Sequence, residues 1–179
     1  MTLPLPAIDC DALIDALVAD RQAGMNAKYF NDLHAEWKQR AAEYETERGN
    51  PRKVPKWPNI EPRKKTFINL YDHPSEGHAQ HQILLDLRNR ALQLCPGCGE
   101  EGTPNTLDHY LPKTEYPHFA VLPSNLAPMC DICQQAKGAD VIDADGRPIF
   151  LHPYFNNFCS KQVLQLRING PYDAPASFR

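Results

Sequence analysis

The sequence lacks any long run of apolar residues. Its apolar stretches extend over only a few residues, whereas a membrane-spanning helix needs about 20. The first ten residues, MTLPLPAIDC, contain neither the basic segment nor the apolar segment of a secretory signal. These two absences exclude a transmembrane helix of ordinary length and predict a cytoplasmic protein that has no membrane partner.

Glycine is also scarce, with nine glycines against seventeen prolines in 179 residues. This balance predicts short elements that are joined by rigid turns. The sequence contains no internal repeat and no low-complexity tract. With 42% apolar residues the chain can form a packed core, which excludes wholesale disorder. The length allows one elaborated domain or two small ones.

The first half of the sequence has the apolar spacing of amphipathic helices. We predict helices over residues 8–19, 26–48 and 78–94, the third running directly into the first cysteine pair. Residues 50–66 contain four prolines and no apolar period, so they are expected to form an irregular connector.

The small net charge of −3 conceals an uneven distribution. Residues 1–47 carry nine acidic and four basic residues, whereas residues 48–65 carry seven basic residues and one acidic residue. Such a basic stretch can contact phosphates, with Trp57 available to stack on a base, although a solvated loop is an equally good interpretation. The candidate phosphate contacts here are Arg52, Lys53, Lys56, Arg63, Lys64 and Lys65.

Two Cys-x-x-Cys motifs carry the strongest chemical information. Cys95 and Cys98 form the first pair, and Cys130 and Cys133 form the second, with 31 residues between the pairs. In a reducing compartment, thiols in this spacing are typical metal ligands. Four thiolates satisfy a tetrahedral zinc ion, so a structural zinc site is predicted. Two unrelated thiol pairs, or a redox motif, are the alternatives.

Asp108 and His109 are adjacent at the end of a predicted strand between the cysteine pairs. Neighbouring strand residues normally point to opposite faces, but a distorted strand end can direct both to one site. A carboxylate suits a hard divalent cation, and a neutral imidazole can take a proton from water.

The motifs in order are Cys-x-x-Cys, Asp-His-x-x-Pro-Lys and Asn-Leu-x-Pro-x-Cys-x-x-Cys-x-x-x-Lys, over roughly residues 92–155. This arrangement resembles the zinc-stapled form of the HNH endonuclease family. The resemblance implies an α+β fold: a ββα-metal (HNH) core with a structural four-cysteine zinc site and a helical N-terminal extension. The first strand is expected at 105–110, the second at 119–127, and the helix near Cys130.

After Cys95 the predicted elements become short and are interrupted by proline, glycine and asparagine, and together with the resemblance this change predicts a division of the chain. Residues 1–90 would form the helical region with its basic, proline-rich connector at about 49–66. Residues 91–160 would form the nuclease core, and residues 161–179 a C-terminal strand and tail. Residues 163–168 alternate like a strand, for which residues 149–151 are the nearest partner. We expect that strand to belong to a longer natural chain or to a sheet completed by another subunit.

Roles are carried over to the matching positions of this sequence. His109 matches the general base and Asp108 a metal ligand. Asn125 matches the residue that ties the hairpin loop together. Gln134 stands where the family has Asn or His, so its longer side chain is expected to hold the catalytic metal less well. Lys113 and Lys137 are the candidate phosphate contacts of the core.

The implied function is a metal-dependent endonuclease that hydrolyses phosphodiester bonds in DNA, with RNA as an alternative substrate. It would use structural Zn²⁺ and catalytic Mg²⁺ or Mn²⁺. The resemblance further implies the nuclease subunit of a bacterial antiphage defence or restriction system, with a protein partner such as an ATPase subunit. The alternative is a catalytically weak, zinc-stabilised module that binds nucleic acid or protein.

Overall fold

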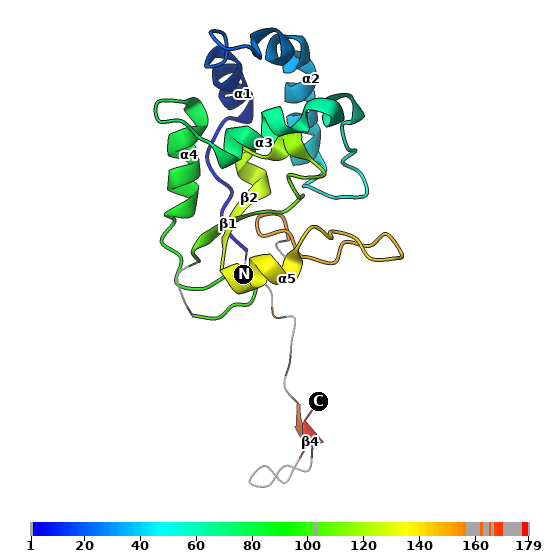
Figure 1. Cartoon of the computed structure of the whole chain (residues 1–179). Coiled ribbons are helices and arrows are strands. Elements are labelled where there is room, and N and C mark those ends of the chain that lie inside the picture. Colours follow the sequence, from blue (N-terminus) through cyan, green and yellow to red (C-terminus); the bar gives the residue numbers. More distant parts are fainter. Residues whose placement is uncertain are drawn as a thin grey trace.

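The computed structural model describes residues 2–101, 104–156, 162, 165, 167–169 and 177–178. The fold is mixed α+β, with a helical end and an opposite end that carries a hairpin and one short helix (Figure 1). The helices are α1 (Cys10–Ala19), α2 (Ala27–Thr46), α3 (Lys64–Asp72), α4 (Ala79–Arg88) and α5 (Asp131–Lys137). The strands are β1 (Thr106–His109), β2 (Leu126–Met129), β3 (Ile168–Asn169) and β4 (Ser177–Phe178), and short 3-10 turns lie at Pro58–Arg63, Pro117–Phe119 and Pro123–Asn125.

The first two predicted helices are confirmed by α1 and α2. Asp9 caps α1, because its carboxylate accepts hydrogen bonds from the backbone N–H groups of Asp11 and Ala12. One face of α2 buries Phe30, Trp37 and other large residues at helical spacing, as the apolar pattern requires.

The predicted connector is wrong over its second half. A 3-10 turn begins at Pro58, and α3 follows it from Lys64. Phe67 and Leu70 are buried one helical turn apart, and this pair is too short an apolar pattern to stand out in the sequence.

The third predicted helix is too long, because α4 ends at Arg88. The backbone of Leu94 forms an isolated antiparallel bridge with Glu101 instead. The first cysteine pair lies between these two residues. A loop whose ends are joined by this bridge therefore replaces the last predicted helical turn.

β1 and β2 pair antiparallel, with Asp108 opposite Ala127 and His109 opposite Leu126. The first predicted strand is confirmed, but the second begins seven residues late and ends at Met129. The 3-10 turns that replace its start each begin with a proline, whose fixed φ suits a helical turn and whose missing N–H weakens a strand.

The predicted C-terminal strand falls partly outside the described residues, which do not include its residues 163, 164 and 166. Ile168 is described, and it pairs with Phe178 of β4. The predicted partner, residues 149–151, is therefore wrong for this position. Ile149 instead donates its backbone N–H to the carbonyl of Val141.

One hydrophobic cluster connects the helical end to the hairpin. It contains buried residues of α1, α2, α3 and α4 together with Leu107, Leu111 and Leu126 of the hairpin region. Residues on both sides of the division predicted at residues 90 and 91 therefore contribute to one cluster. No helix in the described part of the chain has the length and apolar character that crossing a membrane requires.

Candidate metal centre and active site

The four cysteines of the two Cys-x-x-Cys motifs lie together. Their sulfur atoms are all within 4.8 Å of one another. Four thiolates around one zinc ion at about 2.3 Å place their sulfurs about 3.8 Å apart, so the cluster has the dimensions of a metal site. Cys95 is buried and Cys98 is exposed, which puts the cluster at the surface. The described cysteines are free of disulfide bonds.

Backbone amides stabilise the thiolate form of Cys95, one of the four clustered cysteines. Burial raises the pKa of Cys95, yet N–H groups of Cys130, Cys98 and Gly97 outweigh it and lower that pKa to about 7. The N–H of Cys130 lies 3.4 Å from the Cys95 sulfur. Thiolates are the form that binds metal, so these amides favour the ligand state of Cys95, whereas burial raises the pKa of Cys133.

Asp108 and Lys137 form a buried ion pair between β1 and α5. The Lys137 ammonium lies 3.3 Å from the Asp108 carboxylate and 2.6 Å from the carbonyl of His109, to which it donates. Burial raises the pKa of Asp108 despite the neighbouring ammonium. Both side chains line a cavity of about 300 Å³, which also contacts Tyr110 and His152.

His109 faces a different part of the molecule. Its ring lies edge-on to Tyr71 of α3, with centroids 4.4 Å apart, and it does not line the Asp108 cavity. Its Nε2 is 2.9 Å from the carbonyl of Ala120. A carbonyl only accepts hydrogen bonds, so Nε2 carries the proton and Nδ1 keeps its lone pair. Burial lowers the pKa of His109 to about 3.

Asn125 ties the hairpin loop together. Its amide donates to the carbonyls of Leu111 and Phe119, at 3.0 and 3.1 Å, and its oxygen accepts from the N–H of Leu111 at 2.8 Å. Because an asparagine offers both donors and an acceptor, one side chain satisfies both arms of the loop.

Tyr44 connects this loop to α2 and to His152. The N–H of Tyr154 donates to Nδ1 of His152, which leaves the proton on Nε2. Nε2 then donates to the Tyr44 hydroxyl at 2.9 Å, and that hydroxyl donates to the Asn125 oxygen at 3.0 Å. The apolar period of the second helix included Tyr44, but nothing in the pattern pointed to a role for its hydroxyl.

Gln134 does not line the Asp108 cavity, although it lies in α5 and is half-buried. From the same helix, Lys137 contacts Asp108 directly. The structure therefore brings Asp108 together with Lys137, and not with Gln134 or the His109 ring.

Most of the candidate phosphate contacts already pair with protein groups. Lys53 pairs with Glu47, Lys64 with Glu61, Lys56 with Glu115 and Lys113 with Asp72. Arg52 and Lys65 are exposed and have no ion pair among the described residues. Trp57 is 2% exposed, with Arg40 over its ring, so the expectation that it stacks on a base is wrong.

No family model matches this chain, and neither does any solved structure. A stretch of 62 residues is 39% identical to the protein ea31 of Escherichia phage lambda. The stretch covers 35% of this chain and 21% of the phage protein, so the chain spans about a fifth of the length of the curated relative that it matches.

Proposed function

We propose that this chain is a metal-dependent endonuclease of the HNH type that cleaves DNA, with zinc in the cysteine cluster. One arrangement supports the proposal most. The hairpin that carries Asp108, His109 and Asn125 is held at one end by the four clustered thiols and by α5. The proposed setting is a bacterial antiphage or restriction system, in which a partner such as an ATPase subunit would supply targeting.

His109 would act as the general base. Its tautomer leaves Nδ1 free to take a proton from water, and its low pKa keeps the ring neutral at physiological pH. The same burial makes the ring a weak base. A phosphate group beside the ring would stabilise the imidazolium and so raise the pKa of His109 when substrate binds.

Asp108 would hold the catalytic cation. Its carboxylate faces a cavity, and Mg²⁺ commonly uses one or two protein carboxylates together with water and substrate phosphates. The fit is partial, since Lys137 already neutralises this carboxylate. When bound, the cation would stabilise negative charge that develops on the phosphate. Lys137 would then be released to contact the phosphate itself.

Loss of the proposed general base, His109, should slow DNA cleavage strongly. We expect the His109→Ala variant to nick supercoiled plasmid at least about a hundredfold more slowly than the wild type in Mg²⁺ or Mn²⁺, as is usual when a general base is lost. His34→Gln is the matched control, because His34 lies in α2, pairs with Asp15 and lines neither the Asp108 cavity nor any other cavity used in the proposals. Equal nicking by wild type and His109→Ala would reject this active site. In the same assay, Gln134→Asn should be as active as the wild type or more active.

The buried ion pair favours the second candidate function, a zinc-stabilised binding module with weak catalysis. A carboxylate that is already paired with an internal lysine has less need of a cation. Under this proposal the hairpin would bind nucleic acid or a protein partner without cleaving it.

The Lys137→Met variant separates these two functions. Removing the ammonium leaves the Asp108 carboxylate buried and unpaired, which should destabilise the protein by about 3–5 kcal/mol. If Asp108 is a cation site, Mn²⁺ will restore much of the lost melting temperature of this variant. Failure of Mn²⁺ to do so would favour the binding module. The control, Lys28→Met, breaks a surface ion pair with Asp32 and should change stability by about 1 kcal/mol or less.

A further inference from the structure

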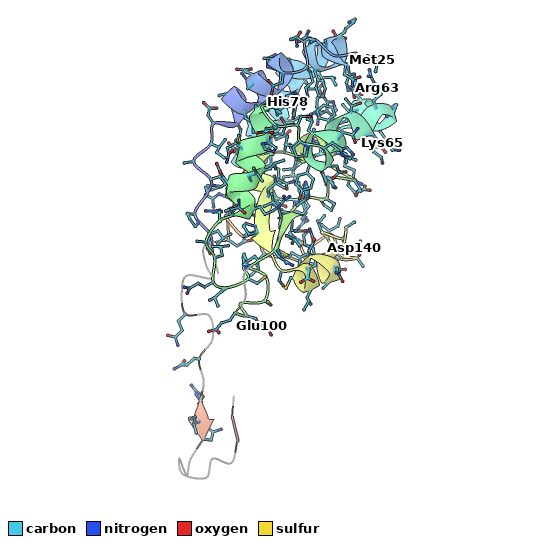
Figure 2. All side chains as sticks on the ribbon, turned by 60° about the vertical axis from the view of Figure 1, so that its left-hand side comes forward. Met25, Arg63, Lys65, His78, Glu100 and Asp140 are labelled. Atoms are coloured by element: carbon cyan, nitrogen blue, oxygen red, sulfur yellow. The ribbon has the colours of Figure 1, made fainter. Side chains whose placement is uncertain are left out.

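A second cavity lies at the helical end of the molecule. It has a volume of about 310 Å³ and lies between the end of α1, the start of α2, α3 and the α3–α4 loop. Figure 2 labels two of its residues, Lys65 and His78, at the end of the molecule that lies away from Glu100. None of the described residues that line this cavity is acidic.

Arg21 lines this cavity, and its guanidinium carries a donor without a partner among the described residues. Its Nη1 atom is buried and has no hydrogen-bond partner among the described residues. The nearest carboxylate oxygen, of Asp20, is 3.8 Å away, too far for a hydrogen bond, and already accepts from the N–H of Ala79 at 2.7 Å. Nδ1 of His78 is likewise buried without a partner. A buried donor left without an acceptor is destabilising by about 1–3 kcal/mol, so a ligand with acceptor atoms would complete the site.

The other residues that line the cavity also favour a ligand with acceptor atoms. Phe30 and Leu70 provide a buried apolar floor. Lys65, Asn69 and His73 are exposed at the mouth. Lys65 has no ion pair among the described residues, whereas its neighbour Lys64 pairs with Glu61. One guanidinium and one ammonium repel cations, and imidazole and amide groups line the same small volume.

We propose that this cavity binds a phosphate group. Several N–H donors around a compact space suit an anion with several acceptor oxygens, and guanidinium and ammonium groups bind phosphate with charge-assisted hydrogen bonds. The group could belong to free phosphate or a nucleotide, or to a nucleic-acid backbone.

The nucleic-acid source rests on the nuclease proposed above. Lys65 and Tyr71 lie six residues apart in α3, a rise of about 9 Å, and Tyr71 contacts His109. Phosphates along one strand of duplex DNA follow one another about every 3.4 Å of helix axis. A duplex whose axis lies parallel to α3 would thus carry phosphates two or three positions apart past the cavity and past His109.

The first test titrates the full chain with inorganic phosphate by calorimetry. We expect saturable binding that Arg21→Gln weakens about tenfold or more, because a charged hydrogen bond is lost. Lys65→Gln should weaken it about two- to fivefold. Lys28→Gln is the control, since Lys28 is exposed at the same end and outside the cavity. Lys65 is exposed, so its variant keeps the fold even if Arg21→Gln does not.

A fluorescent DNA oligonucleotide distinguishes the sources. If Lys65→Gln weakens both phosphate and oligonucleotide binding, the site takes a backbone phosphate. If it weakens phosphate binding alone, the site takes free phosphate or a nucleotide. The proposal is overturned if phosphate does not bind saturably, or if Arg21→Gln and Lys65→Gln both bind it as the wild type does. Phosphate binding without plasmid nicking would reject the nuclease and leave this site intact.

Discussion

Chelation of the metal should lower the melting temperature of the chain by about 10 °C or more. Structural zinc contributes an apparent binding free energy of about 10–16 kcal/mol to small folded units. In a chain of this size, each kcal/mol of lost stability lowers the melting temperature by about 2–4 °C. The cluster joins the loop at Cys95 to the start of α5, so without the metal α5 loses its attachment to the hairpin.

Two cysteine variants test this expectation. Elemental analysis should find about one zinc ion per chain in the wild type and none in Cys98→Ser. Cys98 is exposed, so its loss removes a ligand and little packing. Cys10→Ala is the matched control: Cys10 is a buried thiol near Glu45, outside the cluster, and the variant should keep its zinc. Zinc retained by Cys98→Ser with an unchanged melting temperature would show that the four thiols are not a structural site.

Acid should unfold the protein through three buried histidines. Burial lowers the pKa of His109, His118 and His152 to about 3 in each case. Their pKa in the unfolded chain is about 6.5. Below that pH the unfolded state binds protons that the folded state excludes, so stability is present above pH 6.5 and is lost as the pH falls. Each histidine contributes a slope of about 1.4 kcal/mol per pH unit, and all three together remove about 5 kcal/mol between pH 6.5 and pH 5.

Chemical denaturation at a series of pH values measures this loss. The Asp108 carboxyl acts in the opposite direction, because its pKa is raised in the folded state and its protonation favours folding. His118 is the best residue to replace, since neither of its ring nitrogens has a hydrogen-bond partner among the described residues. His118→Leu should reduce the pH slope by about one third. A flat stability between pH 6.5 and pH 5 would contradict the burial of these rings.

The sequence predicted those parts of the molecule that short-range chemistry determines. The spacing inside each cysteine pair predicted metal ligands, and the apolar period predicted α1 and α2, because each of these patterns lies within a few residues of the chain. It failed where distant contacts decide the outcome. Nothing in residues 58–72 shows that Phe67 is buried against Trp37, and α3 forms because of that packing.

The candidate site shows the same limit. Adjacency in the sequence could not reveal that β1 keeps its regular pairing through His109, which leaves Asp108 and His109 in different surroundings. The motif included Lys137 as a phosphate contact, but its ion pair with Asp108 depends on how α5 packs against β1. The sequence also does not show that Trp57 is buried under Arg40, and this burial prevents the ring from stacking on a base.

The bridge made by Tyr44 bears on how the chain is synthesised. Tyr44 precedes Asn125 by 81 residues and His152 by 108. At about 5–20 residues per second, a ribosome needs about 5–20 seconds to add the segment from Tyr44 to His152. During that interval α2 has left the tunnel without the hairpin that will cover it. Nascent α2 therefore presents Trp37 and Tyr44 without their hydrogen-bond partners, His118 and Asn125, and in that window the growing polypeptide is open to chaperone binding.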